Sequence, residues 1–197
     1  MLKTMETIAR QIVSRLRRAG HEAYFAGGCV RDRLLGKEAH DIDIATSARP
    51  DEVQALFART VAVGAQFGVI VVVEQGGEFQ VATFRADGDY LDGRRPTDVT
   101  FTTAEGDAQR RDFTINGLFY DPVEERVIDF VGGCQDLEAR VVRAIGNPAE
   151  RFAEDKLRVL RGVRFAAALD FEIEEKTWAG IRAGAAAIHE VSAERIR

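Results

Sequence analysis

The sequence predicts an α+β fold, in which a small mixed sheet flanked by helices occupies the first part of the chain and helices alone follow. Three observations support this. An amphipathic helical pattern opens the chain, and short apolar runs of strand length then alternate with glycine-containing turns up to about residue 140. From Pro148 onward the apolar spacing stays helical. We therefore expect a mixed head over residues 1–140 and a helical region over residues 141–197.

The composition is that of a globular protein with a hydrophobic core. Of its 197 residues, 46% are hydrophobic and 30% are charged. The longest apolar stretch, residues 69–73, has the length of a strand and is far shorter than the roughly 18 residues of a membrane span. Cys29 and Cys134 have neither metal-ligand spacing nor the density of a disulfide scaffold. We expect a cytoplasmic protein with no membrane partner, whose oligomeric state stays open.

Charge gives conflicting indications about a nucleic-acid partner. The net charge of −5 argues mildly against one. Arginines nevertheless gather at 94–95, at 110–111 and along the first C-terminal helix, at Arg151, Arg158, Arg161 and Arg164. Such clusters are either solvated charged faces or phosphate sites, and charge alone leaves both interpretations open.

Local patterns predict the elements one by one. Apolar residues recur with helical spacing before Gly20, as in an amphipathic helix with a glycine C-cap. Strand-like runs on both sides of Gly76-Gly77 indicate a β-hairpin. The expected order is a helix over 1–20, a strand at 23–25, a helical turn at 30–35, a strand at 41–45, a helix over 50–57, hairpin strands at 67–74 and 78–85, a polar loop over 86–96, a strand at 99–101, helices over 148–169 and 174–187, and a new helix start at Ser192.

Residues that can carry chemistry lie close to the first two predicted strands. Gly27 and Gly28 stand between a strand and a helix start, where backbone amides can approach a phosphate closely, and Arg31 follows one turn later. Asp41 and Asp43 are two apart on a predicted strand, so both carboxylates project from one face. A divalent cation is the usual reason to tolerate such a pair. Each motif alone is weak, but their joint occurrence is specific.

The segment AGGCVRDRLLGKEAHDIDIAT resembles the signature of the class II tRNA nucleotidyltransferase and poly(A) polymerase family, within the polymerase-β-like superfamily. The similarity continues through FQVATFRADGDYLDGRRPTDVTF, EGDAQRRDFTINGLFYDP, the long segment IDFVGGCQDLEARVVRAIGNPAERFAEDKLRVLRGVRFAAAL, and SAERIR. This resemblance implies a nucleotidyltransferase head with a small mixed sheet, followed by an α-helical neck.

The resemblance also assigns roles around the head. Asp41 and Asp43 would be catalytic and would hold two Mg²⁺ ions, one activating an RNA 3′-hydroxyl and the other binding the triphosphate. The phosphate-binding residues would be Gly27, Gly28, Arg31, Arg111 and Asn116, the last two from the RRDFTxN motif. Asp112 of that motif is either a functional residue in its own right or the ion-pair partner that holds Arg111.

The resemblance makes Asp155 and Arg158 the readers of the incoming base, in place of a template strand. Their spacing of three would put both on one helical face, which Arg161 and Arg164 continue as further base-recognition residues. A carboxylate accepts from the exocyclic amine of C or A, and a guanidinium donates to the neighbouring ring nitrogen or carbonyl. Guanine and uracil present a carbonyl to the carboxylate instead, so CTP and ATP are the expected substrates. Without the resemblance, the same spacing is typical of an intrahelical ion pair.

Two features depart from the family pattern. Gln80 stands where related sequences commonly carry glutamate, which removes a possible third metal-site carboxylate that Asp98, Asp107 or Asp112 would have to replace. The chain also ends at Arg197, whereas family members continue through helical regions that grip tRNA. We therefore expect a fragment with weak affinity for RNA.

The function expected from the resemblance is addition of CMP, AMP or both to the 3′ end of tRNA, with release of pyrophosphate. Full CCA addition or repair, CC-only addition and A-only addition stay open. Poly(A) polymerase is the alternative, although residues 63–68 lack the basic segment that bacterial poly(A) enzymes of this family tend to carry. A non-catalytic nucleotide- or RNA-binding module is the alternative from another class.

Overall fold

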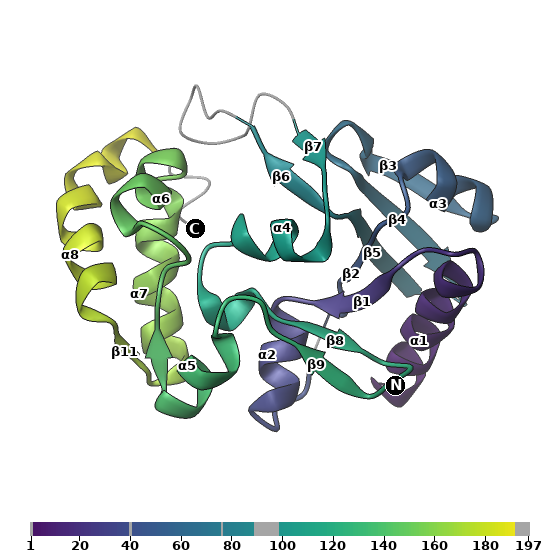
Figure 1. The fold of residues 1–197 in the computed structure, drawn as a ribbon, viewed down its shortest axis with the longest axis horizontal. Coiled ribbons are helices and arrows are strands. Elements are labelled where there is room, and N and C mark those ends of the chain that lie inside the picture. The colour runs from purple at the N-terminus through teal and green to yellow at the C-terminus, as the bar shows by residue number, and fades with distance from the viewer. Residues whose placement is uncertain (1, 40, 76, 89–98, 192–197) are drawn as a thin grey trace.

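The computed structural model describes residues 2–39, 41–75, 77–88 and 99–191. A mixed sheet with its covering helices forms one part of the molecule, and a group of helices formed by the last part of the chain lies at the far end from the N-terminal helix (Figure 1). This arrangement confirms the predicted α+β class. The predicted helix start at Ser192, most of the predicted loop over 86–96, and Asp98 lie outside the described residues.

The main sheet has seven strands in the order β3-β4-β5-β2-β1-β8-β9. The β4–β5 hairpin confirms the pairing expected around Gly76-Gly77. Among the described strands of this sheet, only β2 and β5 run parallel, with Ile44 opposite Val81 and Ala45 opposite Ala82. The strands are β1 (Ala23–Ala26), β2 (Ile44–Thr46), β3 (Thr60–Gly64), β4 (Val69–Glu74), β5 (Gly77–Thr83), β8 (Phe119–Asp121) and β9 (Arg126–Ile128), beside the separate pairs β6 (Arg85–Asp87) with β7 (Val99–Phe101) and β10 (Val141–Val142) with β11 (Glu172–Ile173).

The second strand is shorter than predicted. We expected it over 41–45, but it begins at Ile44, so Asp41 and Asp43 precede it. Ile44 is the first residue of β2, and it pairs with both neighbouring strands, β1 and β5. The two acidic residues therefore lie at the end of the strand rather than on its pleated face, and the alternation argument for their direction does not apply.

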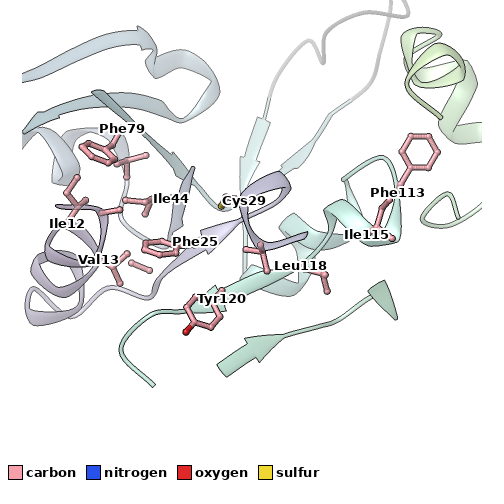
Figure 2. Close-up of a cluster of buried hydrophobic side chains, with 14 of the residues drawn as sticks. Ile12, Val13, Phe25, Cys29, Ile44, Phe79, Phe113, Ile115, Leu118 and Tyr120 are labelled. Atoms are coloured by element: carbon pink, nitrogen blue, oxygen red, sulfur yellow. The ribbon is translucent and has the colours of Figure 1, made fainter. Parts of the chain in front are cut away.

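Helix α1 (Leu2–Arg18) packs its apolar side against the sheet, as its spacing predicts. Ile12 and Val13 are fully buried with Phe25, Ile44 and Phe79 in the core cluster of Figure 2. The helix ends at Arg18, and the φ of 94° at Gly20 allows the amide of the next residue to bond back to the carbonyl of residue 16. The other helices of the head are α2 (Gly28–Leu34), α3 (Pro50–Leu56), α4 (Ala104–Gln109), α5 (Gly133–Ala139) and the 3₁₀ turns η1 (Ala65–Phe67) and η2 (Thr114–Asn116).

The C-terminal helices are α6 (Pro148–Glu154), α7 (Leu157–Leu169), α8 (Glu175–Gly184) and the 3₁₀ helix η3 (Ala185–Glu190). The single helix predicted over 148–169 is therefore wrong. Asp155 is extended, with φ −137° and ψ 105°, and its Oδ1 accepts the amide of Leu157 at 3.0 Å. A short acidic side chain that bonds a nearby amide competes with the helical backbone, so Asp155 ends one helix and begins the next.

One segment joins the sheet to the C-terminal helices, and we call residues 111–116 the joint segment. Its backbone pairs with the chain that follows β10: Thr114 donates to the carbonyl of Arg143 at 2.9 Å, and Ile145 donates to that of Asp112 at 3.1 Å. Phe113 is fully buried and packs edge-on against Phe165 of α7. The same core cluster contains residues of the sheet and of α6, α7 and α8, so the two parts share one hydrophobic core.

Within the part of the chain that the structure describes, we find no helix whose length and apolar character would let it cross a membrane.

Gly133 tests how tightly the joint segment is packed. A Cβ at this position would lie 2.2 Å from the carbonyl oxygen of Thr114, so Gly133→Ala forces backbone to move. We expect a loss of about 1–3 kcal/mol in the free energy of unfolding, measured by urea denaturation. Gly64→Ala is the control, because its Cβ would meet nothing closer than 3.5 Å. Equal stabilities of the two variants would contradict this account.

Candidate active site

A cleft of about 990 Å³ lies between the sheet, the joint segment and α7. Nine of the residues predicted for the site line it, although they come from segments far apart in the sequence: Gly27, Gly28, Arg31, Asp43, Arg111, Asn116, Asp155, Arg158 and Arg161. Asp41 and Arg164 do not line the cleft. Both are exposed, and Arg164 lies on the adjoining surface of α7.

The two glycines differ in what the protein itself requires of them. Gly27 has φ 73°, and a Cβ there would lie 2.9 Å from Nη1 of Arg111. The close approach of an arginine therefore demands glycine at this position. At Gly28 a Cβ would meet nothing closer than Nη2 of Arg31 at 3.7 Å, which is ordinary contact. Packing does not require glycine at 28, although the residue faces the cleft.

The acidic pair has an unfavourable electrostatic environment. Burial raises the pKa of the Asp43 carboxyl above its ordinary value, and the negative charge of Asp41 raises it further, whereas the positive charge of Arg111 opposes both. A cation placed beside the two carboxylates would offset this cost. Two carboxylates fit Mg²⁺, which usually takes one or two from the protein and completes its shell with water and phosphate oxygens.

Position 80 lies beside this pair. Extending the parallel β2–β5 register by one residue puts Gln80 across from Asp43, and both side chains line the cleft. Because Gln80 is neutral, the third carboxylate is missing there. No group of three or more His, Cys, Asp or Glu side chains suited to a metal exists within the described ranges.

The structure decides against one of the two roles left open for Asp112, that of ion-pair partner of Arg111. Nη2 of Arg111 donates to Oδ2 of Asp107 at 2.8 Å, from α4 and four residues earlier. Asp112 instead pairs with Nε of Arg161 at 2.6 Å. Burial alone would raise the pKa of Asp107, but Arg110 and Arg111 lower it overall, so this carboxylate is fully engaged and does not replace the one missing at 80. Sequence analysis missed this role of Asp107, although its i,i+4 spacing to Arg111 was a usable signal.

A chain of hydrogen bonds connects α2 to α7 through the joint segment. Arg31 donates from Nη1 to Oδ1 of Asn116 at 2.8 Å and from Nε to Asp32 at 2.8 Å. Asn116 donates to Oδ1 of Asp112 at 3.1 Å, and Asp112 accepts from Arg161 through its other oxygen. The predicted phosphate-binding residues Arg31 and Asn116 are thus fixed relative to each other and to α7.

Asp155 and Arg158 reach the cleft by a route that the sequence did not indicate. The helix break at Asp155 means that the two do not share a helical face, but both line the cleft. Arg158 is buried, and its Nη1 donates to Glu154 at 2.5 Å and to the carbonyl of Arg151 at 2.9 Å. Arg151 in turn donates to the carbonyl of Arg111 at 2.9 Å. Arg158 is therefore positioned by Glu154, which sequence analysis did not single out, and by Arg151, which it noted only as part of an arginine cluster.

The raised pKa of Asp43 leads to a prediction about how stability depends on pH. Because folding raises the pKa of Asp43, its ionised form opposes folding, and this unfavourable contribution appears as the pH rises through the folded-state pKa. In buffer without divalent cations, Asp43→Asn should therefore melt at a temperature equal to or higher than the wild type at pH 7. The difference should vanish as the pH falls towards 3.8. Thermal melts from pH 3 to 8 measure it.

Asp129 is the matched control. Burial would raise the pKa of Asp129, but backbone amides of residues 131, 133 and 134 lower it overall. Its ionised form stabilises the fold above the ordinary pKa, and that contribution is lost as the pH falls through the folded-state pKa. Asp129→Asn should therefore destabilise the protein at pH 7. A destabilised Asp43→Asn variant at neutral pH would refute the electrostatic account.

Known proteins share this architecture. Residues 23–143 match the family described as the poly A polymerase head domain. A CCA-adding enzyme of Streptococcus pyogenes is 48% identical over 188 residues, which cover 95% of this chain and 46% of that protein. The Bacillus stearothermophilus CCA-adding enzyme in complex with CTP superposes with a TM-score of 0.87 at 40% identity, over 95% of this chain and 45% of that one.

A tRNA nucleotidyltransferase complexed with a primer tRNA and an incoming ATP analog also superposes, with a TM-score of 0.76 at 28% identity, over 94% of this chain and 53% of that one. The chain spans about half the length of the relatives it matches. The matched residues contain the main sheet and the joint segment, which confirms the expected nucleotidyltransferase head followed by part of a helical neck. The chain belongs to the poly A polymerase head domain family, in agreement with the resemblance of its motifs.

Proposed function

We propose that the chain carries the catalytic head, residues 1–140, and part of the neck, residues 141–197, of a template-independent nucleotidyltransferase. It adds CMP, AMP or both from CTP and ATP to the 3′ end of tRNA and releases pyrophosphate. The observation that carries this proposal is the convergence in one cleft of an acidic residue, two arginines held by carboxylates, and the pair Asp155 and Arg158.

The acidic side of the cleft suits a divalent cation. Asp41 and Asp43 would hold Mg²⁺, with remaining ligands from water and substrate phosphates, and two ions fit the proposed reaction. Bound Mg²⁺ supplies positive charge for the attacking oxygen and for the departing pyrophosphate. Before any ion binds, Arg111 is the cation that the pKa of Asp43 senses. Arg111 thus offsets part of the rise in the pKa of Asp43 and favours the ionised form that a metal needs.

The arginines of the cleft suit a triphosphate. Arg31 and Arg111 each have a carboxylate and a carbonyl or amide partner, so their guanidinium groups are oriented before a substrate arrives. Preorganised donors of this kind lose little free energy in reorientation when they bind a phosphate. At Gly28 the protein's own packing leaves space for a Cβ, so a glycine there is explained by close approach of a ligand such as a phosphate.

The pair Asp155 and Arg158 suits recognition of a base. Arg158 is buried and held by Glu154, and Asp155 is fixed by the helix break and by the amide of Leu157. A fixed acceptor and a fixed donor that line the same cleft match the amine and the neighbouring ring atom of cytosine or adenine. Arg161 is engaged with Asp112, so we assign it to holding α7 in place, whereas the notion that Arg161 and Arg164 read the base has less support.

The known relatives support tRNA over other RNAs. The relatives at 48% and 40% identity are CCA-adding enzymes, one solved with CTP, and a structure at 28% identity holds a primer tRNA and an ATP analog. The family description, which names poly A polymerase, keeps poly(A) synthesis as the alternative. A non-catalytic binding module is disfavoured by the preorganised arginines beside the acidic pair.

Incubation with labelled tRNA lacking its 3′ CCA, Mg²⁺ and each nucleoside triphosphate tests the proposal. We expect extension by up to three nucleotides from CTP and ATP. Long adenosine tracts would indicate a poly(A) polymerase instead.

Asp41→Ala and Asp43→Ala should each reduce the rate of nucleotide addition by about a hundredfold or more, because metal stabilisation of the transition state is worth several kcal/mol. Asp51→Ala, an exposed acidic residue in the first turn of α3, is the control. Full activity of the Asp41 and Asp43 variants would refute the assignment.

Base reading is tested by competition among the four nucleoside triphosphates. Asp155→Ala removes the acceptor that distinguishes an amine from a carbonyl, so discrimination against UTP and GTP should weaken by about 1–3 kcal/mol. Arg31→Ala is the matched variant and should weaken all four nucleotides by similar factors, because phosphate contacts carry no base information. If Asp155→Ala lost activity uniformly with its preference for CTP and ATP intact, Asp155 would have only a structural role.

A further inference from the structure

Phe165 of α7 lies at the point where the neck meets the predicted phosphate-binding residues. Its ring lines the cleft and is only half-buried. The guanidinium carbons of Arg31 and Arg161 each lie 5.2 Å from the ring centroid, and that of Arg164 lies 5.7 Å away. Phe113 packs edge-on against the same ring, with 5.9 Å between centroids. One aromatic side chain therefore contacts three cations and the core of the joint segment.

The charges around this ring do not balance. Asp32 pairs with Arg31 at 2.8 Å, and Asp112 pairs with Arg161 at 2.6 Å. For Arg164, the described part of the chain shows no ion pair. Guanidinium groups gathered in this way repel each other, and the negative face of an aromatic ring offsets part of that repulsion. The excess positive charge attracts an anion, and of the three guanidinium groups those of Arg31 and Arg161 line the cleft.

The ring also closes a connection between the head and the neck. Arg31 belongs to α2 and Arg161 to α7, and Asn116 and Asp112 already join them by hydrogen bonds. Those hydrogen bonds hold N–H groups of the two guanidinium groups. The ring of Phe165 is a second contact for both groups, so it restricts the orientations that the hydrogen bonds alone leave open.

We propose that Phe165 is a positioning residue, which aligns Arg31 for a triphosphate and couples that alignment to α7 through Arg161. The inference deepens the proposed function and rests on it for the identity of the anion. A purely apolar role in the core would be served equally by leucine, which fills similar space without an aromatic face. The positioning role requires the π-face itself.

Three variants separate these roles. Phe165→Leu removes the aromatic face and keeps an apolar side chain, whereas Phe165→Tyr keeps the aromatic face. Phe171→Leu is the matched control, because Phe171 is a core residue that follows α7, has Arg140 at 5.5 Å from its ring, and does not line the cleft. The dissociation constants of inorganic tripolyphosphate and of CTP are measured by calorimetry in Mg²⁺ buffer, and melting temperatures are recorded for each variant.

We expect Phe165→Leu to weaken tripolyphosphate and CTP alike, by about fivefold or more, the range that cation–π contacts support. Phe165→Tyr and Phe171→Leu should bind as the wild type does, and the melting temperature of Phe165→Leu should fall no further than that of Phe171→Leu. Unchanged tripolyphosphate binding in Phe165→Leu would overturn the inference, as would a wild-type chain that does not bind tripolyphosphate.

The outcome is separable from that of the proposed function. If the wild type binds tripolyphosphate, Phe165→Leu weakens it, and no nucleotide is added to tRNA, the positioning role stands and the proposed reaction fails. If nucleotides are added to tRNA at the wild-type rate by Phe165→Leu, and anion binding is unaltered, the reaction stands and the positioning role fails.

Discussion

The carboxylate of Asp112 is the interaction on which the cleft depends. It is buried, and it accepts from the amide of Phe113 at 2.8 Å, from Asn116 and from Arg161. These donors come from the joint segment and from α7, so one acidic group joins the sheet domain to the helices. A buried charge is tolerated only when its lone pairs are satisfied, and here the donors that satisfy it also determine where α7 lies. The backbone pairing of the joint segment with residues 143 and 145, and the packing of Phe113 against Phe165, reinforce the same junction.

Much of the fold could be predicted from the sequence because its patterns are local. The amphipathic α1 with its glycine cap, the β4–β5 hairpin and the helical character after Pro148 follow from periodicity and turn chemistry. The strands β3, β8 and β9 were not predicted. The last two have three residues each, too few to show an alternating pattern, and β3 exposes most of its side chains, so it shows no alternation of buried and exposed positions. The break at Asp155 was missed because the apolar spacing on both sides is helical, and a single side-chain bond to the backbone decides the outcome.

Many of the residues of the candidate site could be predicted from the sequence, but the contacts between them could not. Nine of the residues that the motif resemblance selected meet in one cleft, yet the pairings between them depend on contacts distant in sequence. Pairing of Arg111 with its neighbour Asp112 was one of two alternatives, but Arg111 bonds back to Asp107, one helical turn earlier. Asp112 bonds to Arg161 of α7, which lies 49 residues later in the sequence. Residues that hold others in place, such as Glu154 and Arg151, have no chemical signature in the sequence because any charged residue on a helix looks the same before its partner is known.

The sheet order has a consequence for how the protein acquires its site during folding. The β4–β5 hairpin joins strands that are adjacent in the sequence and can form early. β1 instead pairs with the distant β8, so Phe25 is paired only after Tyr120 has been synthesised. Contacts between residues so distant in sequence carry the greatest loop-closure entropy and are made slowly. Gly27 is anchored by the carbonyl of Leu118 at this same junction, and Arg111 packs over it. The glycine turn and the arginine above it therefore need a strand pairing between segments far apart in the sequence, and on a ribosome this pairing cannot form until β8 has emerged.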